Sequence, residues 1–411
     1  MDILFHLLAF LIIARVFGEL AERLGQPASV GEIVSGIVLV SAAAWFGQAL
    51  PFLGQLVASD ALEAAAQIGI FFLLLLAGIE MEPKEIAEHS AASFAVALGG
   101  MTVPLLGGFG LAWLFLPESD LKPMQALLTG IALSISAIPA IVKMLTELGL
   151  LHTRVGEILV TAAIFDDVLG LFLLAVVLSI MEIGTFPDIA TLGLMLAKVT
   201  AFFAITVTLG VHVYPRISRG IKAMQAAAIE FSAITIVALA YGLSAELLGM
   251  HWILGAFMAG LYFEKSRVGW REYNEILGIC GTLTRGVLGP LFFVSIGLQV
   301  DLSAVTAVPV FLLLLVAIAF LGKLLGAGIP ALFVGLHRQE AAIVGIGMSA
   351  RGAVELVLLS IALESGIFSQ AGQKDPIVTH LFSSLVIVGV ITTLVAPIIM
   401  RRLQRRINQN G

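Results

Sequence analysis

Long apolar stretches run through the whole chain, separated by short segments rich in charge, proline or glycine. A helix needs about 20 predominantly apolar residues to cross the roughly 30 Å hydrocarbon core of a bilayer. Cutting the sequence at its polar breaks predicts an all-α polytopic membrane protein with about thirteen transmembrane helices. Their approximate ranges are 3–23, 30–48, 65–82, 91–116, 124–147, 155–181, 190–214, 224–245, 250–263, 278–299, 305–335, 341–364 and 378–400.

Composition agrees with a lipid environment. Of the 411 residues 59% are hydrophobic and 12% are charged, about half the charged share of an average soluble domain. The net charge of −6 and the absence of a long basic run before the tail argue against nucleic-acid binding. The single cysteine, Cys280, excludes an internal disulfide and a cysteine-rich metal cluster. The first apolar stretch lacks a Lys/Arg-rich start, so it is predicted to be a retained helix.

The basic residues give the orientation. With the N-terminus outside, fifteen of the 22 Lys and Arg residues lie at cytoplasmic ends and loops, and only Lys122 and Lys374 lie in external loops. Because positive charge is retained on the cytoplasmic side, the distribution predicts an external N-terminus, a cytoplasmic C-terminus and an odd number of helices. No regulatory domain is expected after the last helix, since only about ten polar residues follow it.

Two halves of six helices are predicted on either side of a linker helix at 190–214. An odd linker inverts the second half relative to the first, which is the repeat architecture of many secondary transporters. The fifth and twelfth helices correspond in the two halves, and small or polar residues interrupt both. Interrupted helices at equivalent positions are the best sequence pointer to a transporter's midplane site. The interrupting residues are Ser134, Ser136 and Pro139 in one helix, and Gly345, Gly347, Ser349 and Gly352 in the other.

Three charged residues are predicted at one depth near the bilayer midplane. At 1.5 Å per residue, Asp166 lies roughly 15–18 Å from the cytoplasmic end of its helix, with Asp167 beside it, and Lys323 lies about 18–21 Å from its own. A charge at this depth costs at least about 2.5–3.5 kcal/mol on insertion scales, so it needs a partner or a function. Two adjacent acids and a distant lysine therefore mark the candidate transport site.

Other polar residues in these helices have two interpretations each. Arg351 can form a structural ion pair with Glu355, four residues later, or with Glu157, or can take part in transport. The hydroxyls of Ser134 and Ser136 can bond to their own helix or contact an ion.

The motifs resemble the monovalent cation:proton antiporters, in particular the bacterial branch typified by NapA and the Kef potassium-efflux systems. The resemblance covers essentially the whole chain, with its motifs in the expected order. They are RLGQPASVGEIVSGIVL at 23–39, GIFFLLLLAGIEMEPKEI at 69–86, IFDDVLGL at 164–171, GPLFFVSIGLQVDL at 289–302, the Lys323 helix and SARGAVEL at 349–356.

The resemblance implies an NhaA/NapA-like fold with crossed discontinuous helices. By resemblance, Asp167 is the carboxylate that binds either Na⁺ or a proton, and Asp166 is its partner that pairs with Lys323. Family members are homodimers of the bacterial inner membrane, and no cofactor is expected. The implied dimerisation domain covers 1–85 and 224–300, and the implied ion-transporting core covers 91–183 and 305–403.

The predicted function is an exchange of cytoplasmic Na⁺ or Li⁺ for external protons by elevator-type alternating access. The paired aspartates resemble the electrogenic branch, although a K⁺/H⁺ antiporter of the Kef type remains an alternative. A sodium-coupled organic-solute symporter is a further alternative, but it does not need a midplane lysine opposite paired acids. An intramembrane aspartyl protease needs two facing carboxylates, whereas neighbouring residues of a helix point about 100° apart. No enzyme activity is expected.

Overall fold

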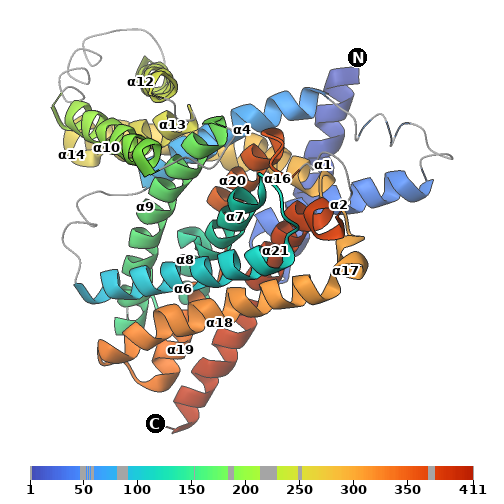
Figure 1. Cartoon of the computed structure of the whole chain (residues 1–411). Coiled ribbons are helices and arrows are strands. Elements are labelled where there is room, and N and C mark those ends of the chain that lie inside the picture. Colours follow the sequence, from blue (N-terminus) through green and yellow to red (C-terminus); the bar gives the residue numbers. More distant parts are fainter. Residues whose placement is uncertain are drawn as a thin grey trace. The chain divides into compact units, whose positions relative to one another are not determined.

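The computed structural model describes most of the chain as helices (Figure 1). The described residues are 2–46, 52, 54, 56, 60–80, 91–151, 153–183, 189–212, 229–248, 252–368 and 375–410, and some side chains within these ranges, including those of Pro139 and Asp167, are outside the description. Within these residues every regular element is a helix. All-helical structure is expected because a helix satisfies its backbone hydrogen bonds within one segment of a chain in lipid.

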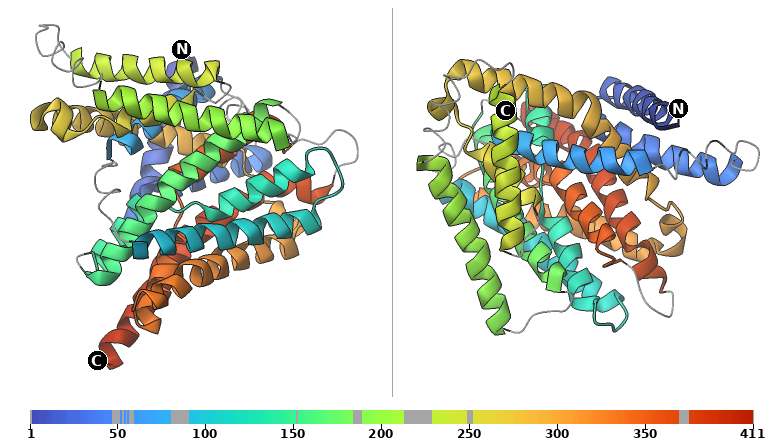
Figure 2. Two further views of the ribbon diagram at one scale, coloured as in Figure 1. Left: turned by 60° about the vertical axis from the view of Figure 1, so that its left-hand side comes forward. Right: turned by 90° about the horizontal axis from the view of Figure 1, so that it is seen from above.

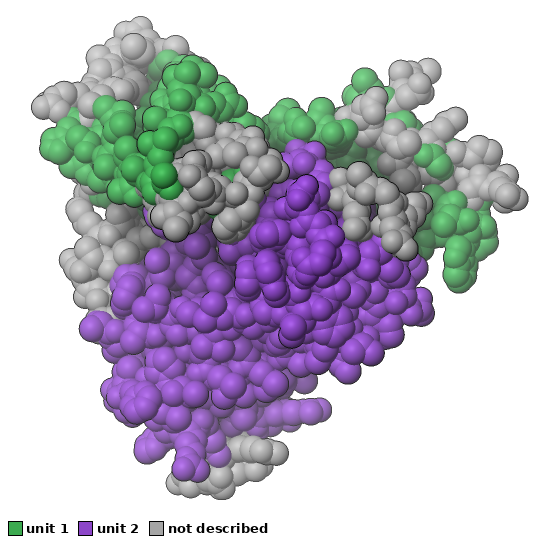
Figure 3. All heavy atoms as spheres, in the orientation of Figure 1, with its two compact units in different colours: residues 1–20, 31–87, 175–298 green, residues 21–30, 88–174, 299–411 purple. Residues whose placement is uncertain are grey.

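The chain divides into two compact units (Figure 3). Unit 1 comprises residues 1–20, 31–87 and 175–298, and unit 2 comprises 21–30, 88–174 and 299–411. The helices that begin in unit 1 are α1 (Asp2–Arg23), α4 (Asp60–Glu80), α10 (Ile189–His212), α12 (Ile229–Leu247), α13 (Ile253–Leu261), α14 (Lys265–Val268), α15 (Trp270–Leu283), the π-helix η1 (Thr284–Leu288) and α16 (Gly289–Leu298). Those that begin in unit 2 are α2 (Ala28–Phe46), α6 (Ala91–Phe115), α7 (Lys122–Ser134), α8 (Ile138–Glu147), α9 (Arg154–Ile183), α17 (Ala304–Ala307), α18 (Pro309–Phe333), α19 (Arg338–Gly347), α20 (Ala353–Glu364) and α21 (Pro376–Asn410).

The protein is a multi-pass membrane protein. Within the described residues, eight helical segments are long and apolar enough to cross a bilayer, including 91–115, 309–333 and the continuous segment 270–298. Each predicted stretch overlaps a described helix or a pair of helices. The number thirteen and the inverted repeat stay predictions.

Two helix boundaries differ most from the predicted ones. The helix predicted at 278–299 begins at Trp270, because α15 starts in a polar turn that is still helical and continues through η1 into α16. The last helix continues to Asn410, ten residues beyond its predicted end, because arginine and glutamine are good helix formers. Hydropathy marks the apolar part of a helix, not its polar ends.

Unit 1 has an apolar core of its own around Phe10, Leu62 and Leu291. Helices α2 and α16 approach closely where Gly36 faces Gly297, since a Cβ on either residue would collide with the backbone of the other helix. Small residues allow such close approach between helices in a membrane.

Unit 2 is built on three helices that pack directly against one another, α6, α7 and α18. Helices α6 and α18 run side by side in Figures 1 and 2. At their contact Gly99 faces Gly326, and a Cβ on either would collide with the carbonyl oxygen of the other. Gly322 packs on Pro104 in the same contact, and Gly130 of α7 packs on the backbone at Leu105. Lys323 therefore lies in α18 between two glycines, Gly322 and Gly326, both of which pack tightly against α6.

The boundaries of unit 2 resemble those of the predicted core, 91–183 and 305–403. Unit 2 also contains residues 21–30, and its first long segment ends at Leu174, within α9. The predicted roles of the two domains, dimerisation and transport, stay predictions.

Candidate functional site

Two interrupted helices lie at the centre of unit 2. Helix α7 ends at Ser134 and α8 begins at Ile138, and the connecting backbone is extended at Ile135, with φ −73° and ψ 137°. Helix α19 ends at Gly347 and α20 begins at Ala353, after an extended Gly352. The two gaps are hydrogen-bonded to each other, since the Ala137 amide donates to the Ala350 carbonyl at 3.0 Å. The predicted interruptions thus occur in both helices and meet.

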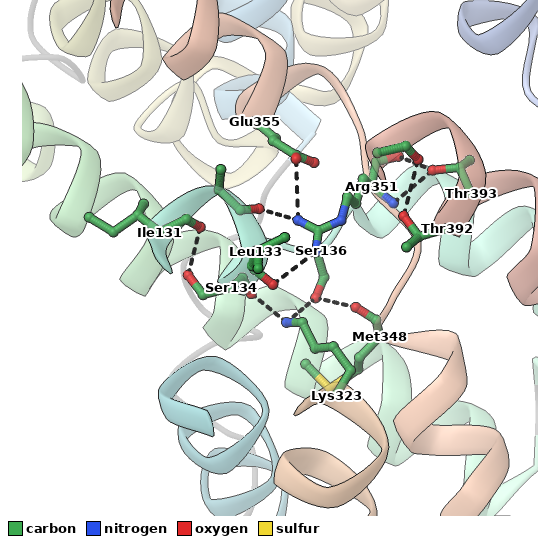
Figure 4. Close-up of polar contacts among 12 residues, drawn as sticks. Ile131, Leu133, Ser134, Ser136, Lys323, Met348, Arg351, Glu355, Thr392 and Thr393 are labelled. Atoms are coloured by element: carbon green, nitrogen blue, oxygen red, sulfur yellow. Dashed lines mark hydrogen bonds and ion pairs between the residues drawn. The ribbon is translucent and has the colours of Figure 1, made fainter. Parts of the chain in front are cut away.

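Lys323 of α18 reaches this crossing with a side chain that is 0% exposed. Its ammonium donates to the Ser134 carbonyl, to Ser136 Oγ at 2.7 Å and to Asp166 Oδ2 at 3.2 Å. Figure 4 shows the amine pointing between the two serines. An ammonium has three hydrogens to donate, and these three oxygens are a matching set of acceptors.

Asp166 of α9 is the counter-charge of Lys323, and its side chain is also 0% exposed. Its Oδ2 accepts a second hydrogen bond, from the Ser136 amide at 2.8 Å. Its Oδ1 is buried and has no hydrogen-bond partner among the described residues. One carboxylate oxygen is thus held by two donors, while the other has none among the described residues. Asp167 follows in the same helix, but its side chain lies outside the described part of the structure.

The two serines have different roles. The Ser134 hydroxyl donates to Ile131 O at 2.8 Å, within its own helix. The Ser136 hydroxyl donates to Met348 O at 2.7 Å and accepts from Lys323. Figure 4 shows Ser136 between Lys323 and Met348. Ser136 therefore joins the lysine to the other interrupted helix, a connection that the sequence did not suggest.

A second buried ion pair lies beside the first. Arg351 Nη1 and Glu355 Oε1 are 3.3 Å apart, and the two side chains are 2% and 1% exposed. Of the two predicted partners, Glu355 is the one that forms the buried ion pair, whereas Glu157 is exposed in the first turn of α9. Arg351 lies in the gap between α19 and α20, and Glu355 lies in the first turn of α20, so the ion pair joins the gap to the helix that follows it.

Two cationic side chains donate hydrogen bonds to the last carbonyls of α7. The last carbonyls of a helix have no partner within it and carry the negative end of the helix dipole. The Arg351 guanidinium donates to Ala132 O and, at 2.9 Å, to Leu133 O, while Lys323 donates to Ser134 O (Figure 4). Three successive carbonyls thus face two buried cations. The sequence predicted Arg351 within the helix at 341–364, whereas it lies in the gap between α19 and α20. The residue types give no signal for these carbonyl contacts.

Two further predicted residues, Ser349 and Gly347, lie at the interruption between α19 and α20. The Ser349 hydroxyl donates to Ile346 O in its own chain segment, and Gly347 packs against Leu159. The side chain of Pro139 lies outside the described residues. No group of three or more His, Cys, Asp or Glu with metal-binding geometry occurs among the residues that the structure describes.

Residues 7–405 match the family described as "Sodium/hydrogen exchanger, transmembrane". The chain belongs to this sodium/hydrogen exchanger family. Its relatives include the Na⁺/H⁺-K⁺ antiporter GerN of Bacillus cereus, 30% identical, with 96% of this chain and 95% of GerN covered. The Na⁺/H⁺ antiporter of Enterococcus hirae is 28% identical, with 98% and 99% covered.

A solved structure has the same fold. It is the sodium proton antiporter MjNhaP1 of Methanocaldococcus jannaschii at pH 8, with a TM-score of 0.71, 18% identity, and 97% of this chain and 96% of that chain covered. This exchanger is accordingly a transmembrane cation/proton antiporter, which is a transporter and not an enzyme. These relatives are named as antiporters, which favours the predicted exchange over the alternative of a sodium-coupled organic-solute symporter.

Proposed function

We propose that this exchanger moves cytoplasmic Na⁺ or Li⁺ outward in return for external protons, with Asp167 as the carrier of cation and proton. The observation that carries the proposal is the fully buried Asp166–Lys323 pair at the crossing of two interrupted helices. A buried carboxylate needs a compensating charge, which a proton or a monovalent cation supplies, but not both at once. This competition couples the two fluxes.

In this proposal the Asp166–Lys323 pair responds to the bound cation. A cation bound at the two aspartates weakens the attraction between Asp166 and Lys323. The lysine ammonium then keeps the Ser134 carbonyl and the Ser136 hydroxyl as acceptors. A lysine that loses its counter-charge in a dry site releases a proton more readily. Two proton-releasing groups for one monovalent cation make the exchange electrogenic.

The proposed movement is of the elevator type. All the described side chains of the site belong to unit 2, so a movement of this unit carries the whole site with it. By resemblance to the family, unit 1 forms the interface of a homodimer. The proposed location is a bacterial inner membrane, with the N-terminus outside and the C-terminus in the cytoplasm.

Potassium is the second candidate ion. The relative GerN is named as a Na⁺/H⁺-K⁺ antiporter, and oxygen ligands alone do not determine which monovalent cation is preferred. The test of function must therefore present Na⁺, Li⁺ and K⁺ separately.

The experiment is cation-driven proton movement in proteoliposomes that contain a pH-sensitive dye. The wild-type protein should show Na⁺-dependent proton flux, and Asp167→Asn should show none while it still inserts and purifies as a folded protein. Asp120→Asn is the matched control, because Asp120 is an exposed acid of the same unit and its loss should leave the flux unchanged. Retained flux in Asp167→Asn would show that another residue carries the ion.

A further inference from the structure

A pocket of mixed chemistry lies at the C-terminal end of the last helix of unit 2. Its walls come from α21 and from the turn that follows α1, and all of its lining residues belong to unit 2. It is distinct from the buried site, since it shares none of that site's residues. The lining residues are Leu24, Gly25, Gln26, Pro397, Ile398, Arg401, Arg402 and Arg405.

The α21 wall is a single stripe along the helix. Spacings of three and four residues place Ile398, Arg401, Arg402 and Arg405 on neighbouring positions of one surface. The three arginines are exposed, and no lining residue is acidic. Guanidinium groups present planar pairs of donors that match phosphate oxygens. The cationic half of the pocket therefore suits a phosphate group.

The other half of the pocket is apolar and open. Leu24 is 79% exposed and Ile398 is 50% exposed, and Pro397 lies beside them. The apolar run of α21 ends at Met400, directly before the first of these arginines. The pocket thus lies where the apolar run of α21 changes to a basic segment, and such a boundary in a membrane-spanning helix is expected at the level of the headgroups. Inorganic phosphate makes no favourable contact with this apolar wall, whereas a lipid acyl chain can pack against it.

Hydrogen bonds hold the walls in place. Gln26 Nε2 donates to Leu394 O at 3.5 Å, which ties the turn after α1 to α21. The turn itself is closed by the Gly25 amide on Glu22 O and the Gln26 amide on Ala21 O, both at 2.9 Å. Gly25 has φ 73°, which glycine adopts readily. Because these backbone amides are used within the turn, the ligand must be held by side chains.

We propose that this pocket binds the phosphate of an anionic phospholipid, with Arg402 and Arg405 as its main ligands and an acyl chain along Leu24 and Ile398. Basic pockets between transmembrane helices at the cytoplasmic face are suited to anionic headgroups. The site would stabilise unit 2, since α21 also bonds to the buried ion-pair region, where the Arg351 amide donates to Thr393 Oγ1 at 3.1 Å.

The test is the shift in thermal unfolding temperature of the purified full chain in a mild detergent. The added probes are phosphatidylglycerol, phosphatidylcholine with the same acyl chains, and inorganic phosphate. Phosphatidylglycerol should raise the unfolding temperature of the wild type more than phosphatidylcholine does. The variant Arg402→Gln/Arg405→Gln should lose this difference. The charge-matched control Arg271→Gln/Arg338→Gln removes two exposed arginines outside the pocket and should keep it.

Three outcomes would overturn the proposal. An unchanged difference in the pocket variant would mean that the arginines do not hold the lipid. An equal loss in the control variant would mean that only net charge matters. If inorganic phosphate raised the unfolding temperature as much as phosphatidylglycerol does, the site would bind free phosphate. Native mass spectrometry of retained phosphatidylglycerol gives a second measurement that does not depend on the stability of the variant.

Discussion

At the scale of single residues, the site depends on how Lys323 is held. Three oxygens from three different kinds of group, a backbone carbonyl, a hydroxyl and a carboxylate, accept from its ammonium. In the proposed cycle, a bound cation weakens the attraction between Asp166 and Lys323, and the lysine keeps the Ser134 carbonyl and the Ser136 hydroxyl as neutral acceptors. The serine hydroxyl thus has a larger share in holding the amine at that stage of the cycle than before cation binding.

Ser136→Ala should slow Na⁺-driven proton flux by roughly tenfold or more, because a hydrogen bond to a charged group is worth about 1.5–3 kcal/mol. The change also removes the hydrogen bond to Met348 O. Ser134→Ala is the matched control, since its hydroxyl bonds only to Ile131 O among the described contacts and its carbonyl is untouched. Equal flux in the two variants, measured with the pH dye, would contradict the role of Ser136.

Sequence reasoning reached part of this arrangement. Counting the helical rise placed Asp166 and Lys323 at one depth, and the structure has them 3.2 Å apart. The hydroxyl of Ser136 and the carbonyls that hold Arg351 had no signal, because contacts made by backbone oxygens leave no trace in residue type. For Arg351 the sequence allowed Glu355 as well as the distant Glu157, and the structure identifies Glu355 through its contact with the guanidinium.

At the scale of elements, close packing of helices fixes the position of the lysine. Gly326 is one turn from Lys323, and its backbone touches that of Gly99 in α6. The apolar pattern predicted both helices, 91–116 and 305–335, but not which face of each would be in contact. Glycine-rich stretches suggest close approach, yet the partner of each glycine comes only from the three-dimensional structure.

Gly326→Ala should destabilise the protein by about 1–3 kcal/mol, as extra volume does in a packed interior, and should lower its thermal unfolding temperature in detergent. The added Cβ would collide with Gly99 O, so the helices must separate. Gly110→Ala in α6 is the control, because a Cβ there meets nothing within 4 Å and alanine favours a helix by up to about 1 kcal/mol. An equally unstable Gly110→Ala protein would show that the close contact is not the cause.

At the scale of the whole molecule, the exchanger family match covers residues 7–405, so the likeness includes both units and not the site alone. The charge carried per transport cycle is a property at this scale. It depends on how many protons the complete site releases for each cation that it binds, and the voltage dependence of exchange measures it.

Lys323→Arg should leave exchange measurable but electroneutral, because arginine keeps its proton at every pH that the transporter meets. The measurement is the exchange rate in proteoliposomes at clamped membrane potentials. The wild-type rate should change with voltage and the variant rate should not. Lys265→Arg, at an exposed lysine of unit 1, should behave like the wild type. A voltage-dependent Lys323→Arg protein would reduce the lysine to a counter-ion, and complete loss of exchange would contradict both roles.

The crossing of the interrupted helices also determines when the site can first exist during biosynthesis. Ser136 and Met348 are 212 residues apart in the chain, and Asp166 and Lys323 are 157 apart. At a synthesis rate of about 5–20 residues per second, Asp166 enters the membrane at least about 8 s before its lysine. A nascent first half therefore holds the Asp166 carboxylate without its counter-charge, and the carbonyls at the end of α7 without the cations that donate to them. The candidate site is complete only after the last third of the chain, which supplies Lys323, Met348 and Arg351, has been inserted.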